Sequence, residues 1–370
     1  MRSLAELHES HGATVTERGG QSVVAHYGQP TRTHQAVRSG VGVVEHGVDV
    51  LVVTGDDRVD YVDNVVSNRV PTTDGRGVYA LLLTPRGRIR TDMYVFNAGE
   101  RLLVLLPPGK GDPVGTDWAE KTFIQDVDID LATESFAVFG VHGPQATEKL
   151  ASVFTTTTPE QPLRFVRGSM GDIGVTAVRT DGLTGEEGYA VICDTADAGE
   201  VFDTLETRGL NAVPFGYQSW ETLTLEAGTP LFCSELDGAV PNNLGLSAAV
   251  DYEKGCFVGQ EVVSRVANRG RPTKQLVGLR TDRVPATDAA VFDGPESVGT
   301  VTRAAESPTL GNPVALALVD RDIGDSLGES GSLTVRVDGE ERPATPVALP
   351  FVEGSDRSGR LPVPDDNPAE

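Results

Sequence analysis

The chain has 370 residues, enough for two or three domains with buried cores. Its 54 acidic and 31 basic residues give a formal net charge of −23, and such a surface repels the phosphate backbone of nucleic acids. The three cysteines are widely spaced without a CxxC pair, which argues against disulfides and structural zinc and predicts a cytoplasmic protein. No apolar run reaches the roughly 18 residues that are needed to span a membrane.

The charge pattern also bears on the source of the protein. Arginine supplies nearly all of the basic residues, and the acids are scattered as short pairs rather than gathered in one tail. A hydrated acidic surface of this kind stays soluble in high salt, which favours a halophilic source. An acidic mesophilic protein with a codon bias towards arginine is the alternative.

The first half of the chain predicts a short helix and then a sheet. Leu4, Leu7 and His8 share one helical face after Ser3, and the segment ends at Gly12. Between residues 49 and 107, four β-rich runs alternate with the turn-forming stretches PRG and NAGE. This part of the chain is expected to form an antiparallel sheet.

The second half predicts strand-and-helix units followed by strands alone. SFAVFGVHG leads into a helix at QATEKLASVF, and two further strands flank the loop DGLTGEE before helices at AGEVFDTLETRG and WETLTLEAG. From about residue 275 only short β runs remain, which predicts a small barrel. The expected division is 1–48 with 132–272, 49–131, a barrel at 273–353, and a flexible, polar tail at 354–370.

The stretch EKGCFVGQEVVSR is expected to form a turn from a strand (AAVDY) into a helix. Gly255 and Gly259 give the backbone freedom on either side of the turn. Gln260 and Glu261 fall in the first helical turn, where an acid complements the helix dipole, and Glu261 can pair with Arg265 four residues later.

Lys254 and Cys256 in the same stretch allow two interpretations. A thiol just before a helix, beside a lysine, is in the kind of electropositive setting that makes cysteine nucleophilic. A small residue that fills a tight turn is the alternative, because a free cysteine usually behaves as a buried hydrophobe. Spacing alone favours the second interpretation.

The residues KGCFVGQE resemble the K-G-C-[FY]-x-G-Q-E signature of the YgfZ-type family of folate-binding and iron–sulfur cluster assembly proteins, in which Phe257 matches the aromatic position. That family is related to the glycine-cleavage T-protein, an aminomethyltransferase. GVYALLLTPRGRIRTDMYVF, TDGLTGEEGY and ETLTLEAGTPLF resemble T-protein segments in the same order. The resemblance implies an α+β fold of three domains in a ring around a central folate channel, with a small C-terminal β barrel.

The resemblance also implies site residues. Asp92 matches the catalytic aspartate of the T-protein, and Tyr79 falls at the position of a folate-contacting tyrosine, with cross-strand packing as its alternative role. Glu186 is retained in the TDGLTGEEGY loop as a cofactor-binding candidate or as a turn element. Lys254 and Cys256 become the candidate reactive pair.

The chain departs from the T-protein pattern at five positions, the first of which is Thr91, where the T-protein has the other aspartate of a pair. Ala190 replaces the glutamate that binds the pterin, and Leu183 replaces a tyrosine of the loop. Trp220 and Thr224 replace two helix arginines, which predicts a loss of positive charge at the site. No metal site is indicated, because the six histidines show no HxH or HxxxH spacing.

The leading function implied by the resemblance is a folate-binding accessory protein for assembly or repair of [4Fe-4S] clusters, with iron–sulfur assembly or client proteins as partners and Cys256 as its thiol. The alternative is a tetrahydrofolate-dependent aminomethyltransferase that uses Asp92, and a third possibility is a scaffold that only binds folate. Tetrahydrofolate or a related pterin is the expected cofactor in each case. A monomer is expected.

Overall fold

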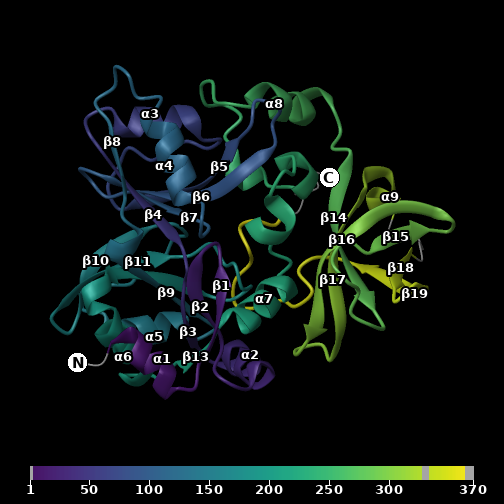
Figure 1. Cartoon of the computed structure of the whole chain (residues 1–370). Helices are drawn as coiled ribbons and strands as arrows, with labels where there is room; N and C mark the ends of the chain where they lie inside the picture. Colours follow the sequence, from purple (N-terminus) through teal and green to yellow (C-terminus); the bar gives the residue numbers. More distant parts are fainter. Residues whose placement is uncertain (1–2, 327–332, 363–370) are drawn as a thin grey trace, which may run out of the picture.

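The computed structural model describes residues 3–326 and 333–362. Two sheets with helices on their outer faces lie against each other, and a barrel stands to one side of them (Figure 1). The α+β architecture and the C-terminal barrel expected from the sequence are therefore confirmed.

The first sheet has five antiparallel strands in the order β5-β6-β7-β4-β8. Their bounds are β4 (Asp49–Thr54), β5 (Arg76–Leu83), β6 (Ile89–Asn97), β7 (Leu102–Leu106) and β8 (Asp128–Leu131). Alternation along β7 sends Leu102 and Val104 towards the core under helices α3 (Arg58–Val65) and α4 (Gly111–Ala119), and Leu103 and Leu105 towards the other sheet.

The second sheet has six strands in the order β10-β11-β12-β9-β3-β13. Its strands are β3 (Gly42–Glu45), β9 (Phe136–His142), β10 (Phe165–Met170), β11 (Ile173–Arg179), β12 (Gly188–Asp194) and β13 (Val213–Pro214). One face packs on α1 (Leu4–Ser10), α5 (Ala146–Val153) and α6 (Ala198–Thr207), whose apolar side chains share a core with it. The predicted N-terminal helix is thus confirmed, with Ser3 as its cap.

The two sheets meet face to face. Val50, Phe96 and Leu105 of the five-stranded sheet pack against Val138 and Val178 of the six-stranded sheet. A hairpin of β1 (Thr14–Arg18) and β2 (Gln21–His26) lies beside them, with α2 (Pro30–Ser39) next to it (Figure 1). The site described below is built on these facing surfaces.

Helix α7 (Tyr217–Glu226) connects the sheets to the barrel through a buried carboxylate. Glu226 has no exposed side-chain surface and accepts hydrogen bonds from His34 Nε2 (3.0 Å) and Arg38 Nε (3.1 Å) on α2. From the barrel it accepts bonds from Ser307 Oγ (2.5 Å) and Thr309 Oγ1 (2.8 Å). One side chain therefore joins three parts of the fold.

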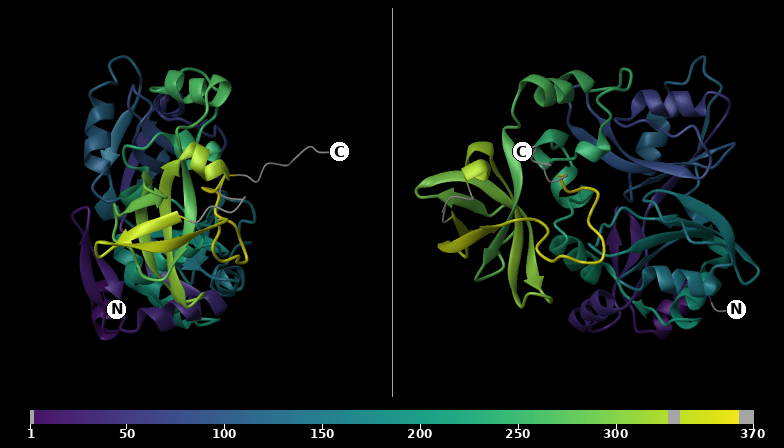
Figure 2. Two further views of the ribbon diagram at one scale, coloured as in Figure 1. Left: turned by 90° about the vertical axis from the view of Figure 1, so that its right-hand side faces the viewer. Right: turned by 180° about the vertical axis from the view of Figure 1, so that it is seen from behind.

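The barrel closes in the order β14-β17-β16-β15-β18-β19. Its elements are β14 (Lys274–Thr281), β15 (Ala290–Asp293), β16 (Glu296–Ser307), β17 (Asn312–Asp320), α9 (Arg321–Ser326), β18 (Leu333–Val337) and β19 (Glu340–Val347). Figure 2 shows it standing apart from the two sheets, with the chain after β19 returning towards them.

The strand predicted just before Cys256 is absent from the structure, so this prediction is wrong. The expected strand AAVDY covers residues 248–252, which instead begin in a 3₁₀ turn (Ser247–Ala249), after another at Pro241–Leu244, and continue without a strand. The Ala249 carbonyl accepts a bond from Ser67 Oγ (2.6 Å) and the Ala248 carbonyl from Asn68 Nδ2 (2.8 Å), so side chains satisfy this backbone in place of a neighbouring strand. The helix expected after the turn is present as α8 (Gln260–Arg269).

The prediction of a flexible C-terminal tail is wrong for residues 354–362. Ser358, Arg360 and Leu361 are buried there, because this segment returns from the barrel and packs against the sheets. Residues 363–370, the rest of the predicted tail, lie outside the described residues. The division of the chain into domains stays an interpretation.

Candidate functional site

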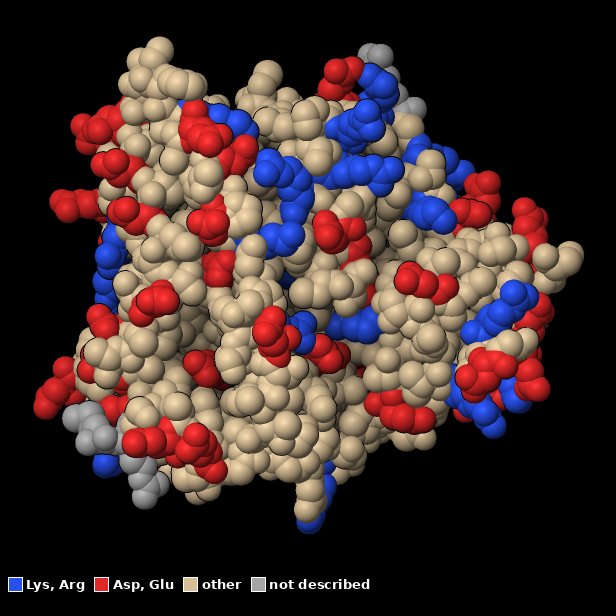
Figure 3. Space-filling view, in the orientation of Figure 1, with Lys and Arg blue, Asp and Glu red and all other residues tan. Residues whose placement is uncertain are grey.

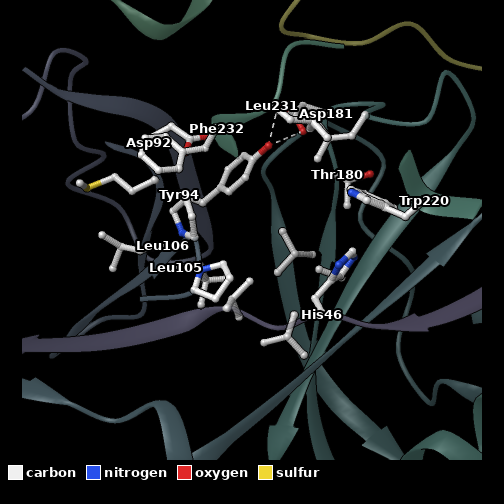
Figure 4. A pocket seen from close by; sticks show the side chains of 18 of the residues that line it. His46, Asp92, Tyr94, Leu105, Leu106, Thr180, Asp181, Trp220, Leu231 and Phe232 are labelled. Carbon is white, nitrogen blue, oxygen red and sulfur yellow. Dashed lines mark hydrogen bonds between the residues drawn. The ribbon is translucent and has the colours of Figure 1, made fainter. Parts of the chain in front are cut away.

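A pocket of about 190 Å³ lies between the facing surfaces of the two sheets (Figure 4). Phe96 and Leu105 line it from one sheet, Val138 and Val178 from the other, and Trp220 from α7. The walls are mostly apolar, and polar groups are concentrated at two places. Such a pocket suits a flat organic ligand that is oriented by a few hydrogen bonds.

Asp92 on β6 provides the first polar group. Its side chain is buried, and its Oδ2 accepts a hydrogen bond from the Tyr79 hydroxyl (3.0 Å) and lies 3.1 Å from Arg360 Nη1. Its Oδ1 is buried and has no hydrogen-bond partner among the described residues. Because Asp92 lines the pocket, Oδ1 is the oxygen left to accept a bond from a ligand.

Tyr94 and Asp181 extend this group. Tyr94 is two residues after Asp92, so strand alternation puts both side chains on the same face of β6. The Tyr94 hydroxyl donates to the two Asp181 carboxylate oxygens (2.9 and 3.1 Å), as the dashed lines of Figure 4 show. Burial raises the pKa of Asp181 and raises the pKa of Tyr94 well above its usual range.

Arg360 is the cation of the group. Its guanidinium donates to the Tyr94 hydroxyl oxygen (3.0 Å) and the Pro230 carbonyl (3.1 Å), and it lies 4.3 Å from the centre of the Tyr79 ring. Burial alone would lower the pKa of Arg360, but the surrounding tyrosines and carboxylates outweigh it and raise that pKa further. The guanidinium is therefore a fixed positive charge in the wall of the pocket.

The second polar group lies between the six-stranded sheet and α7. His142 is 1% exposed, and neither of its ring nitrogens has a hydrogen-bond partner among the described residues; Thr180 Oγ1 is likewise buried without one. Burial lowers the pKa of His46 to about 4 and that of His142 well below its usual range, so both rings are neutral at pH 7. Trp220 packs against both rings, at 4.7 and 5.2 Å between centres.

Two glycines make room for these rings. A Cβ added at Gly188 would lie 2.5 Å from Thr180 Oγ1 and 2.6 Å from His142 Nδ1. A Cβ at Gly140 would lie 2.4 Å from His46 Nε2 and 2.5 Å from His142 Nε2. The three polar side chains are therefore gathered over the bare backbone of β9 and β12.

The structure brings two of the predicted site residues together and leaves a third elsewhere. Tyr79 and Asp92 share the hydrogen bond given above. Glu186 does not line the pocket. Its carboxylate accepts bonds from Arg38 (3.1 Å) and from the amide and hydroxyl of Ser355 (2.9 and 2.6 Å). It contacts the chain after the barrel, and the pocket is bounded by other residues.

Lys254 and Cys256 also lie outside the pocket lining. The Lys254 ammonium donates to the carbonyl of Asp63, in the last turn of α3, and to the carbonyls of Val66 and Asn68, just beyond the helix, and burial lowers its pKa. Cys256 is exposed. This geometry gives the lysine a structural role at the end of a helix, and a reactive role for the thiol stays a prediction.

The other motif residues hold the turn. Phe257 is buried in the cluster below the five-stranded sheet, and Gln260 Nε2 donates to the Lys254 carbonyl (3.4 Å). Gly259 has φ +85°, and a Cβ there would lie 2.6 Å from the Thr84 carbonyl oxygen. The predicted pair between Glu261 and Arg265 is confirmed. Nothing lies within 4 Å of a Cβ added at Gly255.

The expected loss of positive charge at the site is wrong, because arginines from elsewhere supply it. Arg303 of β16 donates to Thr224 Oγ1 (3.0 Å), one of the two positions where the arginines were expected to be lost. Arg18 and Arg360 both line the pocket, together with Trp220 at the second such position. The guanidinium groups of Arg18, on β1, and of Arg360, in the C-terminal segment, therefore lie at the same pocket as α7, which has no arginine at these positions.

Several pocket residues escaped the sequence analysis. Alternation along β6 could have identified Tyr94, and the loop already singled out contains Asp181. His142 carries no spacing signal, since its neighbours in the pocket come from other strands and helices. Nothing in the local sequence indicates Arg360, which follows a polar stretch resembling a disordered tail.

Charged side chains are distributed unevenly over the surface of the molecule. On the face shown in Figure 3, acidic side chains are scattered over the centre and the edges, and basic ones gather over α8 and towards β14. Within residues 3–326 and 333–362, no cluster of three His, Cys, Asp or Glu side chains is placed to bind a metal ion. In the same part of the chain, no helix has the length and apolarity needed to cross a membrane.

Comparison with known proteins finds relatives along nearly the whole chain. An aminomethyltransferase of Saccharopolyspora erythraea is 33% identical over 364 residues, covering 94% of this chain and 96% of the relative. An aminomethyltransferase of Bacillus subtilis is 29% identical over 329 residues, covering 86% and 90%. The crystal structure of the glycine cleavage system aminomethyltransferase T from Bartonella henselae matches with a TM-score of 0.84 at 22% identity, over 96% of this chain and 98% of that one, and supports the fold.

These relatives overturn the leading functional expectation. An accessory role in iron–sulfur cluster assembly is wrong, because relatives of similar length and up to 33% identity are named aminomethyltransferases. The position of Cys256 outside the pocket agrees with this correction. The finding favours the alternative interpretation of the sequence.

Two family models account for most of the residues. The GCVT N-terminal domain matches residues 4–254, and the glycine cleavage T-protein C-terminal barrel domain matches residues 274–353. The second match coincides with the closed barrel. The chain therefore belongs to the glycine cleavage T-protein family.

Proposed function

We propose that this protein is a tetrahydrofolate-dependent aminomethyltransferase. The observation that carries the proposal is the buried carboxylate of Asp92, which is held through Oδ2 and has Oδ1 unpartnered at an apolar pocket. Tetrahydrofolate is the one-carbon acceptor of the aminomethyltransferases in this family. The branch to which the KGCFVGQE motif belongs stays a prediction.

The residues of the pocket fit a reduced pterin. Such a ring has apolar faces and an edge of hydrogen-bond donors and acceptors, and the pocket has apolar walls with unpartnered polar atoms on Asp92, His142 and Thr180. Ala190, at the position of the missing pterin glutamate, lies in the wall of the same pocket. We infer that neutral His142 and Thr180, which can donate and accept, take over the hydrogen bonds of that carboxylate.

Bound tetrahydrofolate would supply the two nitrogen atoms that accept the methylene carbon, while the bonds from that carbon to its amine and to the carrier protein break and release ammonia and the free carrier. Asp92 Oδ1 would accept a hydrogen bond from an N–H of the folate or of the departing amine, and its negative charge would stabilise positive charge that develops there. The apolar walls exclude water, which strengthens this interaction. Tyr79 and Arg360 hold the carboxylate in place.

The test is transfer from an aminomethylated carrier protein to tetrahydrofolate, measured as formation of methylenetetrahydrofolate by the purified protein. We expect turnover by the unaltered protein and a loss of about 10²-fold or more in kcat for Asp92→Asn, since the amide keeps the shape but not the charge. Asp74→Asn, at an exposed aspartate that pairs with Arg167, is the matched control. Absence of turnover by the unaltered protein, under conditions where a known T-protein works, would refute the proposal.

A further inference from the structure

The segment after the barrel enters the site from outside the part of the chain that the family models match. The barrel model ends at residue 353, and Arg360 lies seven residues beyond it. Yet Arg360 is 5% exposed and lies 3.1 Å from the carboxylate on which the proposed function depends. An arginine buried so completely is uncommon, because desolvation of its charge must be offset by specific partners.

The Arg360 guanidinium contacts two residues that line the pocket, Asp92 and Tyr94, and two that lie beside it. Nη1 faces Asp92 Oδ2 and the Pro230 carbonyl, Nη2 donates to the Tyr94 oxygen, and the flat guanidinium covers the Tyr79 ring. Tyr79 and Arg360 together occupy Oδ2 of Asp92 and leave Oδ1 free. The oxygen left for a ligand is therefore Oδ1.

The loop 181–187 holds the segment in this position. Ser355 bonds to Glu186, the Asp356 amide donates to the Gly185 carbonyl (3.2 Å), and the Gly359 amide donates to the Asp181 carbonyl (2.7 Å). Arg179, at the end of β11, forms an ion pair with Asp356 (2.8 Å).

Close approach explains the glycines of this contact. A Cβ at Gly354 would lie 2.0 Å from the Gly185 carbonyl oxygen, and a Cβ at Gly182 (φ +72°) would lie 2.6 Å from the Arg357 carbonyl oxygen. The two backbones can lie this close only without side chains at these positions. The loop is thus shaped to receive residues 354–359.

We propose that Arg360 is a positioning residue of the site: it fixes Asp92 so that Oδ1 faces the pocket, and residues 354–362 are the element that delivers it. The proposal rests on the proposed transferase function, in which Asp92 acts on the bound folate. Arg360 acts through Asp92, so its effect is expected to depend on the presence of that carboxylate.

The test is a double-mutant cycle on the full-length protein with Arg360→Gln, Asp92→Asn and the pair. We expect Arg360→Gln to lower kcat about tenfold or more with a smaller change in KM for tetrahydrofolate. Arg360→Lys should retain part of the kcat that Arg360→Gln loses, because lysine keeps the positive charge but lacks the planar set of N–H donors of the guanidinium. In the Asp92→Asn background the same substitution should cause little further loss. Arg357→Gln is the matched control, because the Arg357 side chain is exposed and donates to the Pro362 carbonyl rather than to a residue that lines the pocket.

Independent readouts separate this inference from the proposed function. The same cycle is measured by the midpoint of thermal unfolding and by tetrahydrofolate binding through quenching of protein fluorescence, and coupling of the two sites is expected in the unfolding midpoint even if no turnover occurs. Two results would overturn the positioning role, provided that the unaltered protein turns over. In the first, the loss of kcat in the double variant equals the product of the losses in Arg360→Gln and Asp92→Asn. In the second, Arg360→Gln has the same kcat as the unaltered protein. An increase in turnover in Arg360→Gln would indicate that Arg360 obstructs the pocket, and this result would also overturn the positioning role. Failure of the unaltered protein to bind folate or turn over would count against the proposed function instead.

Discussion

Asp92 and His142 mark the two polar ends of one pocket, and both carry unpartnered atoms. A buried polar atom without a partner destabilises the folded protein, so such atoms in a pocket wall indicate groups that a ligand satisfies. The Asp92 carboxylate forms an ion pair with Arg360, whereas His142 is neutral at pH 7. The two ends are therefore expected to recognise different parts of the ligand.

Substitution of His142 tests the neutral end. His142→Phe keeps a flat ring but removes both nitrogens, and we expect the dissociation constant for tetrahydrofolate to rise about tenfold, equivalent to about 1.4 kcal/mol. His142→Gln retains a donor and an acceptor and should bind more tightly than His142→Phe. Fluorescence quenching provides the measurement, and unchanged affinity in His142→Phe would show that the ligand does not contact this ring.

At the scale of elements, helix α7 is joined to α2 and to the barrel through Glu226. Burial alone would raise the pKa of Glu226, but the hydrogen bonds and charges of His34, Arg38 and Ser307 outweigh it and lower that pKa from 4.5 to about 2. The carboxylate thus stabilises the folded state by an amount of the order of 3 kcal/mol at neutral pH. This contribution is complete above the unfolded pKa and is lost as the pH falls through the folded pKa.

The Glu226→Gln variant should therefore unfold at a lower temperature than the unaltered protein at pH 7. The difference is expected to shrink as the pH falls from 4.5 towards 2, because protonation removes the advantage of the carboxylate. Thermal unfolding followed by circular dichroism across this range is the measurement. Glu9→Gln, at an exposed position on α1, serves as the control, and a difference that is independent of pH would contradict the assignment.

For the whole molecule, a net charge of −23 implies strong repulsion within the folded state in dilute buffer. Salt screens this repulsion, with a Debye length that falls from about 10 Å at 0.1 M to about 3 Å at 1 M. We expect the unfolding midpoint to rise steeply when KCl is increased over this range. An equal osmolality of a neutral solute is the control, and a midpoint insensitive to KCl would contradict a halophilic source.

The sequence by itself determined the elements that depend only on short stretches of the chain. Alternating apolar residues specified the antiparallel sheet and the barrel, because burial of one strand face depends only on residues two apart. The resemblance to the T-protein singled out Asp92 and Tyr79, and the structure shows that they lie on paired strands and share a hydrogen bond. The pair of Glu261 and Arg265 was also predictable, because it depends only on one helical turn.

Tertiary structure alone decided which distant groups complete the site. Arg360 reaches Asp92 from 268 positions along the chain, and His142 acquires Thr180 and His46 as neighbours over two glycines. A buried cation in a polar stretch is possible only because carboxylates and aromatic rings from other elements offset its desolvation, and no local pattern encodes those partners. For the same reason Lys254, which the sequence offered as the partner of a reactive thiol, instead donates to carbonyls at the C-terminal end of α3 and just beyond it.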